Sequence, residues 1–442
     1  MVRNTFFRKF WSAVLPGLCL LIAASPAGGQ DAPALQPDGP PLVLELTGNL
    51  RLGDVVTRVL LQNPELQSFF HEVRAREAAA IQAGLLPNPH LSFQAEDAAG
   101  TGQLGGFDRS ELTLQLSQIL ELGGKRRARE HSALLLRDLG QWDYERTQWA
   151  VLTRAAQSFA DVLAAQEEVA LNLEMVHLAE KTLNVVSERV RSGKVSPLEE
   201  TRARINLSNT RMEKDRAQRN LEIARIGLVA TWGSDAPEFG KAVGDFYRAP
   251  EPVAYDELKK NLDRNPEIAR WSAERTHRQS LLALEESRAV PDLQVHGGYR
   301  RIEETNDNAL VFGFSVPLQL FDRNQGAIEE ARSRLNRMEA EKKSVETRIH
   351  TDFDRAYQEL HLAFRQVTLL ESEILPGAQT SFEAISEGYR YGKFGLLDVL
   401  DSQRTFFEGK KRYLHALADY HKSLAEVERL SGSLILGEEA RP

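Results

Sequence analysis

Two acidic residues stand at matching places after two glycines, and a third follows one of them; such carboxylates could attract cations. Glu199 follows Gly193 by six residues. Asp398 follows Gly392 at the same distance, and Asp401 comes three residues later, so the two aspartates share one face of any helix formed there. Grouped carboxylates concentrate cations from solution. The simpler interpretation is that acids in the first turn of a helix complement its dipole.

Three other patterns resemble ligand sites but lack the required surroundings. The Gly100–Gly105 run matches G-x-G-x-x-G, but it lies between two alternating segments and opens no helix. Gly124-Lys125 lacks the upstream glycine and the following Ser or Thr of a phosphate-binding loop. His71-Glu72 has no second histidine at helical spacing. Because no nucleophile elbow occurs either, the sequence predicts no enzyme, no cofactor and no resident metal site.

The charge balance argues against a nucleic-acid partner. The 442 residues include 55 Lys and Arg against 63 Asp and Glu, a net charge of −8, and no basic stripe is evident. Proteins that bind nucleic acid generally carry a basic excess. A hydrophobic fraction of 42% is enough for a folded chain. We therefore expect a folded protein that binds no nucleic acid.

Residues 1–30 have the order of a secretory signal peptide, with basic residues, an apolar run over 13–24 and then small residues. The apolar run is too short to anchor the chain across a membrane. Cleavage near 27–30 would also remove Cys19, the only cysteine, and with it disulfides and cysteine-based metal sites. Lipid attachment to Cys19 is disfavoured because Leu18 precedes it, where a small residue is needed.

The sequence repeats itself once. Four landmarks recur in the same order at offsets of 202 or 199 residues. They are Asn63-Pro64-Glu65 with Asn265-Pro266-Glu267, Pro89 with Pro291, Gly193-Lys194 with Gly392-Lys393, and Gly233 with Gly432. Four ordered coincidences indicate a duplicated unit. The predicted organisation is a signal peptide (1–30), an extended segment (31–50), a first repeat (51–233), a linker (234–252), a second repeat (253–432) and a tail (433–442).

Long helices are expected to position the acids. Each repeat should open with a helix, over 65–86 and 267–290, and later contain a very long helix, a Gly-containing turn and a returning helix. Residues 126–191 hold no Pro and a single Gly. Packing residues recur at the seven-residue spacing of coiled coils. They are Trp142, Trp149, Ala156, Leu163 and Ala170 with Leu152, Phe159 and Leu173, and in the second repeat Phe406, Tyr413, Tyr420 and Val427 with Leu417 and Leu424.

Four short segments alternate apolar and polar residues, over about 89–98, 110–119, 291–301 and 309–318. Their length would cross a bilayer as tilted strands. The simpler interpretation is a soluble hairpin with one wet face. Four strands alone leave open edges, which lipid does not tolerate, and a barrel needs about eight or more strands. A membrane role therefore requires two, three or four chains to pool their strands, and the pattern does not choose among these.

Four runs together resemble the outer-membrane efflux channels of the TolC type. They are Leu-Pro-Asn-Pro-His-Leu at 86–91, Ser-Gln-Ile-Leu-Glu-Leu-Gly-Gly-Lys-Arg at 117–126, Val-Pro-Leu-Gln-Leu-Phe-Asp-Arg-Asn-Gln-Gly at 316–326 and Tyr-Gly-Lys-Phe-Gly-Leu-Leu-Asp-Val-Leu-Asp at 391–401. The second and third are most similar to the subfamily that serves heavy-metal exporters of the cobalt-zinc-cadmium and copper-silver type. The resemblance covers essentially the whole mature chain.

The resemblance implies a mainly α fold with a small membrane β part. Long helical hairpins would form a periplasmic tunnel, and three chains would contribute four strands each to a twelve-stranded barrel in outer-membrane lipid. The implied partners are two further copies, a periplasmic adaptor and an RND-type inner-membrane pump. The channel would passively conduct heavy-metal cations. The alternatives are the same channel serving organic drugs or type I secretion, and, in another class, a periplasmic coiled-coil adaptor or scaffold.

The resemblance also assigns roles at the two Gly-containing turns, which would form the periplasmic tip. Asp398, Asp401 and Glu199 would project at the entrance. Tyr389, just before the second turn, would bond across to Glu199 and hold the entrance narrow. The residues implied for the tips and for adaptor docking are Gly193, Ser196, Leu198, Gly392, Gly395 and Leu397.

Overall fold

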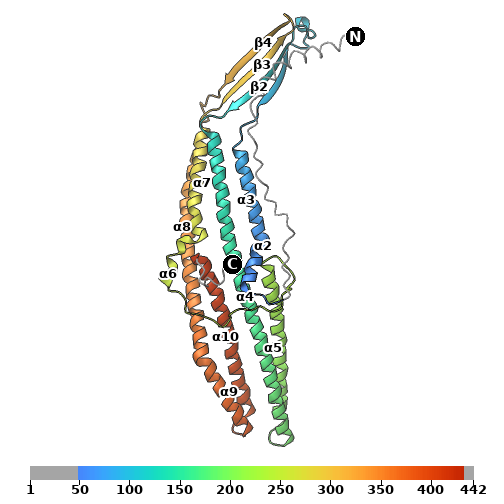
Figure 1. Cartoon of the computed structure of the whole chain (residues 1–442), viewed down its shortest axis with the longest axis vertical. Helices are drawn as coiled ribbons and strands as arrows, with labels where there is room; N and C mark the ends of the chain where they lie inside the picture. The colour runs from blue at the N-terminus through green and yellow to red at the C-terminus, as the bar shows by residue number, and fades with distance from the viewer. Residues whose placement is uncertain (1–47, 433–442) are drawn as a thin grey trace, which may run out of the picture. The chain divides into compact units, whose positions relative to one another are not determined.

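The computed structural model describes residues 48–432, and these form long helices and one four-stranded sheet (Figure 1). The predicted signal peptide, nearly all of the extended segment and the C-terminal tail lie outside the described residues. None of the helices within 48–432 has both the length and the apolar composition that a membrane span needs.

The predicted elements occur in the predicted order, but each repeat opens with a short helix that was not predicted, and the long helix of the second repeat is interrupted. The first contains α2 (Leu52–Gln62), α3 (Pro64–Ala83), β1 (His90–Glu96), a short turn of helix (Gly102–Leu104), β2 (Glu111–Leu120), α4 (Lys125–Arg191) and α5 (Pro197–Ala230). The second repeat opens with α6 (Tyr255–Lys259) and a helical turn (Leu262–Arg264). The second contains α7 (Pro266–Arg288), β3 (Leu293–Ile302), β4 (Asp307–Ser315), α8 (Gln325–Leu369), a π-helical turn (Leu370–Ile374), α9 (Leu375–Arg390) and α10 (Leu396–Ser431).

The repeated Asn-Pro-Glu landmark joins the two ends of each repeat. The Asn63 side chain caps α3 by accepting a hydrogen bond from the Leu66 amide at 2.9 Å. The same side chain donates to the Thr231 carbonyl, just after α5, at 2.7 Å. Asn265 does the same in the second repeat, with bonds of 2.8 and 2.9 Å. In each repeat, one asparagine therefore caps the start of a helix and also bonds to the end of the returning helix.

The heptad prediction is confirmed in α10 and only partly in α4. Phe406, Leu417, Tyr420 and Val427 are buried in the main core. In α4 only Phe159 and Leu163 of the predicted seam are fully buried, whereas Ala170 and Leu173 are exposed, so the prediction was wrong for those two. The reason is that α4, with 67 residues, packs in turn against α3, α7, α10 and α5, so no single seam runs along it.

The four strands form one antiparallel sheet in the order β1-β2-β3-β4, so β2 and β3 join the two repeats. All four predicted strands are confirmed, with ends shifted by a few residues. The register aligns apolar residues on one face, namely Leu91, Phe93, Leu112, Leu114, Leu116, Leu310, Phe312 and Phe314. The other face carries Ser92, Gln94, Thr113, Gln115, Ser117 and His296.

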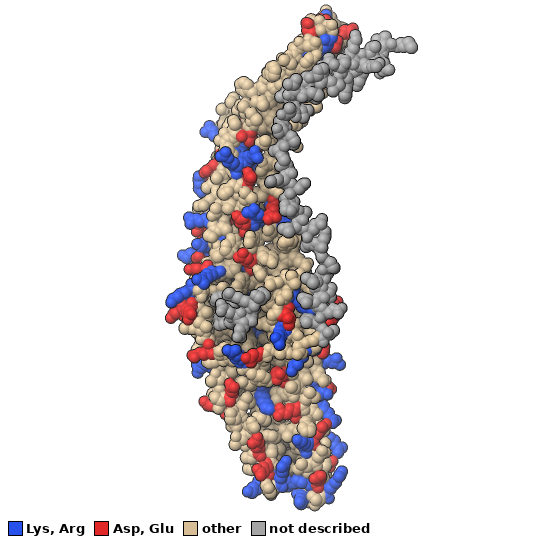
Figure 2. Space-filling model, viewed as in Figure 1, with Lys and Arg blue, Asp and Glu red and all other residues tan. Residues whose placement is uncertain are grey.

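The apolar face of the sheet is open to its surroundings. Phe312 and Phe314 are each 76% exposed, and Leu310 is 70% exposed. Figure 2 shows the visible side of the sheet almost free of Lys, Arg, Asp and Glu along its length, with charged side chains at its loop end. Within residues 48–432, β1 and β4 each pair on one side only. An exposed apolar band with two open edges needs a partner or an apolar solvent.

Candidate functional site

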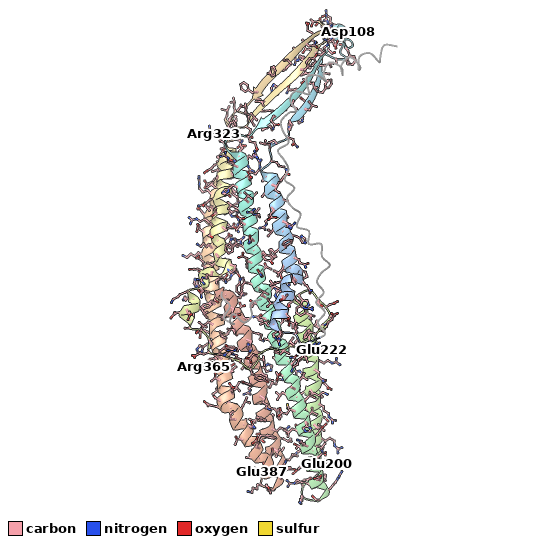
Figure 3. The ribbon with its side chains drawn as sticks, viewed as in Figure 1. Asp108, Glu200, Glu222, Arg323, Arg365 and Glu387 are labelled. Carbon is pink, nitrogen blue, oxygen red and sulfur yellow. The ribbon has the colours of Figure 1, made fainter. Side chains whose placement is uncertain are left out.

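Two tight turns end the helical hairpins α4–α5 and α9–α10. Gly193 and Gly392 have φ values of +68° and +78°, a left-handed conformation that favours glycine. After each glycine a lysine amide bonds back to the helix, from Lys194 to the Arg189 carbonyl and from Lys393 to the Gly388 carbonyl, both at 2.9 Å. Glu200 and Glu387, labelled in Figure 3, mark the two hairpins at this same end of the helices.

The two returning helices differ in the hydrogen bonds at their first turns. Ser196 caps α5, because its hydroxyl accepts a hydrogen bond from the Leu198 amide at 3.3 Å. Gly395, at the equivalent position before α10, has no side chain. There the Asp398 carboxylate accepts a hydrogen bond from the Gly395 amide at 2.9 Å. Glu199 matches Asp398 in the first repeat, but its side chain contacts another helix.

Glu199 accepts a hydrogen bond from Tyr389 of the other hairpin. The Tyr389 hydroxyl donates to Glu199 Oε2 at 3.2 Å, which confirms the predicted contact between the hairpins. Tyr389 is only 4% exposed. Burial raises the pKa of its hydroxyl to about 12, the negative charge of Glu199 adds to the rise, and the nearby Arg189 cation opposes it. The phenol therefore stays protonated and remains a donor across the physiological range.

Arg189 is a member of this contact that the sequence reasoning missed. Its guanidinium carbon lies 4.4 Å from the centre of the Tyr389 ring, which is cation–π geometry. Its Nη1 also donates to the Tyr389 carbonyl, and its Nε is buried without a hydrogen-bond partner. A basic residue in the last turn of a helix is common because it complements the dipole, so nothing in the sequence marks Arg189 as special.

A small apolar cluster, separate from the main core, surrounds this contact. Its buried members are Val186, Ala203, Tyr389, Leu396 and Val399, which come from α4, α5, α9 and α10. The tips of the two hairpins are thus held together by few apolar residues and by the Arg189–Tyr389–Glu199 contacts. We call these three residues the tip triad.

Asp398 and Asp401 lie on α10 as predicted, but each already has a partner. Asp398 caps the helix. Asp401 forms an ion pair with Arg404 at 2.7 Å, and both side chains are about two-thirds exposed. No hydrogen bond among the described residues joins Glu199 to either aspartate. Across residues 48–432, no group of three or more His, Cys, Asp or Glu side chains is placed to hold a metal ion.

The predicted docking leucines occupy equivalent and exposed positions. Leu198 and Leu397 are the second residues of α5 and α10, with exposures of 55% and 59%. An apolar side chain in this position covers no core of its own chain. Each could contact a partner that approaches the tips.

The sequence matches known proteins along most of its length. The outer membrane efflux protein family matches residues 55–234 and 258–433, one segment for each repeat. Two relatives are metal-resistance proteins. The cobalt-zinc-cadmium resistance protein of Cupriavidus metallidurans is 33% identical over 88% of this chain and 91% of its own length. The nickel-cobalt-cadmium resistance protein of Alcaligenes xylosoxydans is 27% identical over 71% of each chain.

Solved structures have the same fold. A membrane protein from Pseudomonas aeruginosa superposes with a TM-score of 0.75 over 86% of this chain and 93% of its own, at 18% identity. The duplicated hairpins, the shared sheet and the family match over both repeats lead to one conclusion. The chain belongs to the outer membrane efflux protein family, the TolC-type channels of the Gram-negative outer membrane.

Proposed function

We propose that this protein is the exit channel of a tripartite efflux system and that it passively conducts heavy-metal cations out of the cell. The observation that carries the proposal is the sheet, which has one apolar face, one polar face and two open edges, and which is continuous with two long helical hairpins. A polar inner wall and an apolar outer wall are what a membrane pore requires.

The proposal requires a homotrimer. Three sheets joined at their open edges would make a closed barrel of twelve strands, which leaves no edge in lipid. The helices also support an assembly of several chains. Exposed apolar side chains follow α5 at seven-residue spacing, namely Leu198, Ile205, Met212 and, after one gap, Ile226. Leu362 and Leu369 form a similar exposed pair on α8. Stripes of this spacing suit helix packing between chains.

The hairpin tips would be the entrance, and the tip triad would hold it narrow. Because the triad joins α4, α5 and α9, separating the two hairpins must break its contacts. Asp398 and Asp401 would then favour cations at the opening. A periplasmic adaptor would dock at the tips, on the exposed Leu198 and Leu397 and on the turns that contain Gly193, Ser196, Gly392 and Gly395. An RND-type inner-membrane pump would supply the energy.

Heavy-metal cations are the proposed substrate because two relatives are named for resistance to cobalt, cadmium, zinc and nickel. The test is a deletion strain of the source organism that carries the wild-type gene or an empty vector. We expect the empty-vector strain to lose tolerance to Co²⁺, Zn²⁺ or Cd²⁺ and the wild-type gene to restore it. Tolerance to organic toxins, measured in parallel, should not change. Unchanged tolerance to all of these metals would contradict the substrate assignment.

A further inference from the structure

A network of ion pairs joins the two repeats where α3, α4 and α7 meet. Arg270 on α7 donates a hydrogen bond to the Asp143 carboxylate on α4 at 2.8 Å, and Arg76 on α3 lies 3.7 Å from the same carboxylate. Glu274 on α7 accepts a hydrogen bond from Arg278 at 2.7 Å and lies 3.4 Å from Arg270. We call these five residues the repeat junction. They hold α7 of the second repeat against α3 and α4 of the first.

His277 is buried beside the repeat junction. It lines a cavity of about 300 Å³ together with all five junction residues. His277 is only 7% exposed, and its Nδ1 is buried without a hydrogen-bond partner. Within residues 48–432, no ion pair involves His277, although both ring nitrogens of an imidazolium need acceptors. A proton on His277 would therefore bring a buried positive charge that no carboxylate is placed to receive.

The charges around His277 balance only while the imidazole is neutral. Three cations are paired with three carboxylates, and the carboxylates include Glu72, which binds Arg76 at 2.8 Å. Glu341 of α8 also lines the cavity, but it is paired with Arg337 at 2.7 Å. Burial lowers the pKa of His277, Glu274 opposes this fall, and the three arginines of the cluster add to it. One added proton thus leaves one positive charge in excess.

The first repeat shows which part of this arrangement belongs to the duplicated helix. An acid and an arginine four positions apart form an ion pair on both α3 and α7, and the two pairs match at the 202-residue offset of the landmarks. His277 has no such counterpart, because Ala75 stands at its position in α3. The ion pair is therefore common to both repeats, whereas the histidine is particular to the second.

We propose that His277 is an acid-sensitive element of the repeat junction, and that a proton on it loosens the packing of α7 against α3 and α4. Opening of the junction would hydrate the imidazolium and separate it from the three arginines. Since the packed chain binds this proton less readily than the opened chain, acid favours opening. The effect is absent well above the ordinary histidine pKa of 6.5 and grows as the pH falls below it. The proposal does not depend on the channel function or on metal transport.

The test is hydrogen–deuterium exchange of the purified full-length protein in detergent, at about pH 8 and about pH 5. The exchange is read by mass spectrometry and corrected for the intrinsic rate at each pH. We expect the protection of α7 peptides to fall several-fold at the acid pH in the wild type. His277→Gln keeps a neutral side chain at both pH values and should lose less than half as much protection. Equal losses over α7 in the two proteins, or no loss in the wild type, would overturn the proposal.

Two further variants locate the effect. His71→Gln is the matched control, because His71 is exposed on α3 and lies outside the cavity lining, and it should keep the wild-type response. His277→Ala introduces the residue type that the first repeat has at this position and should reduce the response as His277→Gln does. If His277→Gln fails to fold, His277→Ala and His71→Gln still decide, since equal losses over α7 in those two would refute the role of His277.

Discussion

The hydroxyl of Tyr389 in the second repeat donates to the carboxylate of Glu199 in the first repeat, at 3.2 Å. The two repeats differ at this position. Glu199 in the first repeat contacts the other hairpin, whereas its counterpart Asp398 accepts a hydrogen bond from the Gly395 amide at the start of its own helix. The bond from Tyr389 to Glu199 thus joins the two hairpins.

The Tyr389 hydroxyl should keep the entrance closed. Tyr389→Phe keeps the ring against Arg189 but removes the donor to Glu199. A hydrogen bond to a charged group contributes about 1.5–3 kcal/mol, so we expect the open fraction in planar-bilayer recordings to rise by about tenfold or more. Tyr391→Phe is the control, because Tyr391 is 75% exposed and two residues away. Equal open fractions for the two variants would show that the bond does not restrain the entrance.

Arg189 should contribute separately from the hydroxyl. Arg189→Met keeps an apolar stem beside the ring and removes both the cation–π contact and the hydrogen bond to the Tyr389 carbonyl. We expect a several-fold rise in open fraction, since a desolvated cation–π contact contributes about 1–2 kcal/mol. Arg191→Met, in the same last turn but exposed, should have no effect. Equal open fractions for the two arginine variants would show that Arg189 does not restrain the entrance.

The pKa of Tyr389 predicts how its stabilisation depends on pH. Its folded pKa of about 12 lies above the ordinary value of 10.0, so the folded chain favours the neutral phenol. The stabilisation is fully present below pH 10 and is lost as pH rises toward 12, because the unfolded chain loses its proton first. The ultraviolet difference titration between wild type and Tyr389→Phe should have its midpoint near 12. A midpoint at the ordinary tyrosine value would contradict the burial and the bond.

Asp398 and Asp401 should give the pore its preference for cations. The double variant Asp398→Asn with Asp401→Asn keeps a capping oxygen for α10 while it removes both charges. We expect a weaker cation preference in reversal-potential measurements and weaker block by multivalent cations. Glu222→Gln serves as a control for lost charge elsewhere on the helices. The prediction fails if the double variant retains wild-type selectivity and block.

Much of the fold was predictable because it follows from local patterns. The alternation of apolar and polar residues predicted the four strands, the absence of Pro predicted α4, and the recurring landmarks predicted the duplication. The exposure of Ala170 and Leu173 was not predictable, because it depends on which helix α4 meets at each point along its length. A seven-residue repeat of apolar residues shows that a helix packs against other helices, but it does not identify which helices these are.

The site was predictable in part. The Tyr389–Glu199 bond followed from family resemblance, and the positions of Asp398 and Asp401 on one face followed from their spacing. The role of Arg189 could not be predicted, because a basic residue at the end of a helix is already explained by the helix dipole. The hydrogen bond from the Gly395 amide to Asp398 becomes visible only when the turn geometry is known.

The most direct test of the central claim is the assembly and conductance of the purified protein. Its mass in detergent, measured by light scattering with correction for bound detergent, should be that of three chains, and the same material should form discrete ion-conducting pores in liposomes or planar bilayers. A stable monomer that never inserts into lipid and conducts no ions would contradict the claim that identical chains share their strands to form one channel.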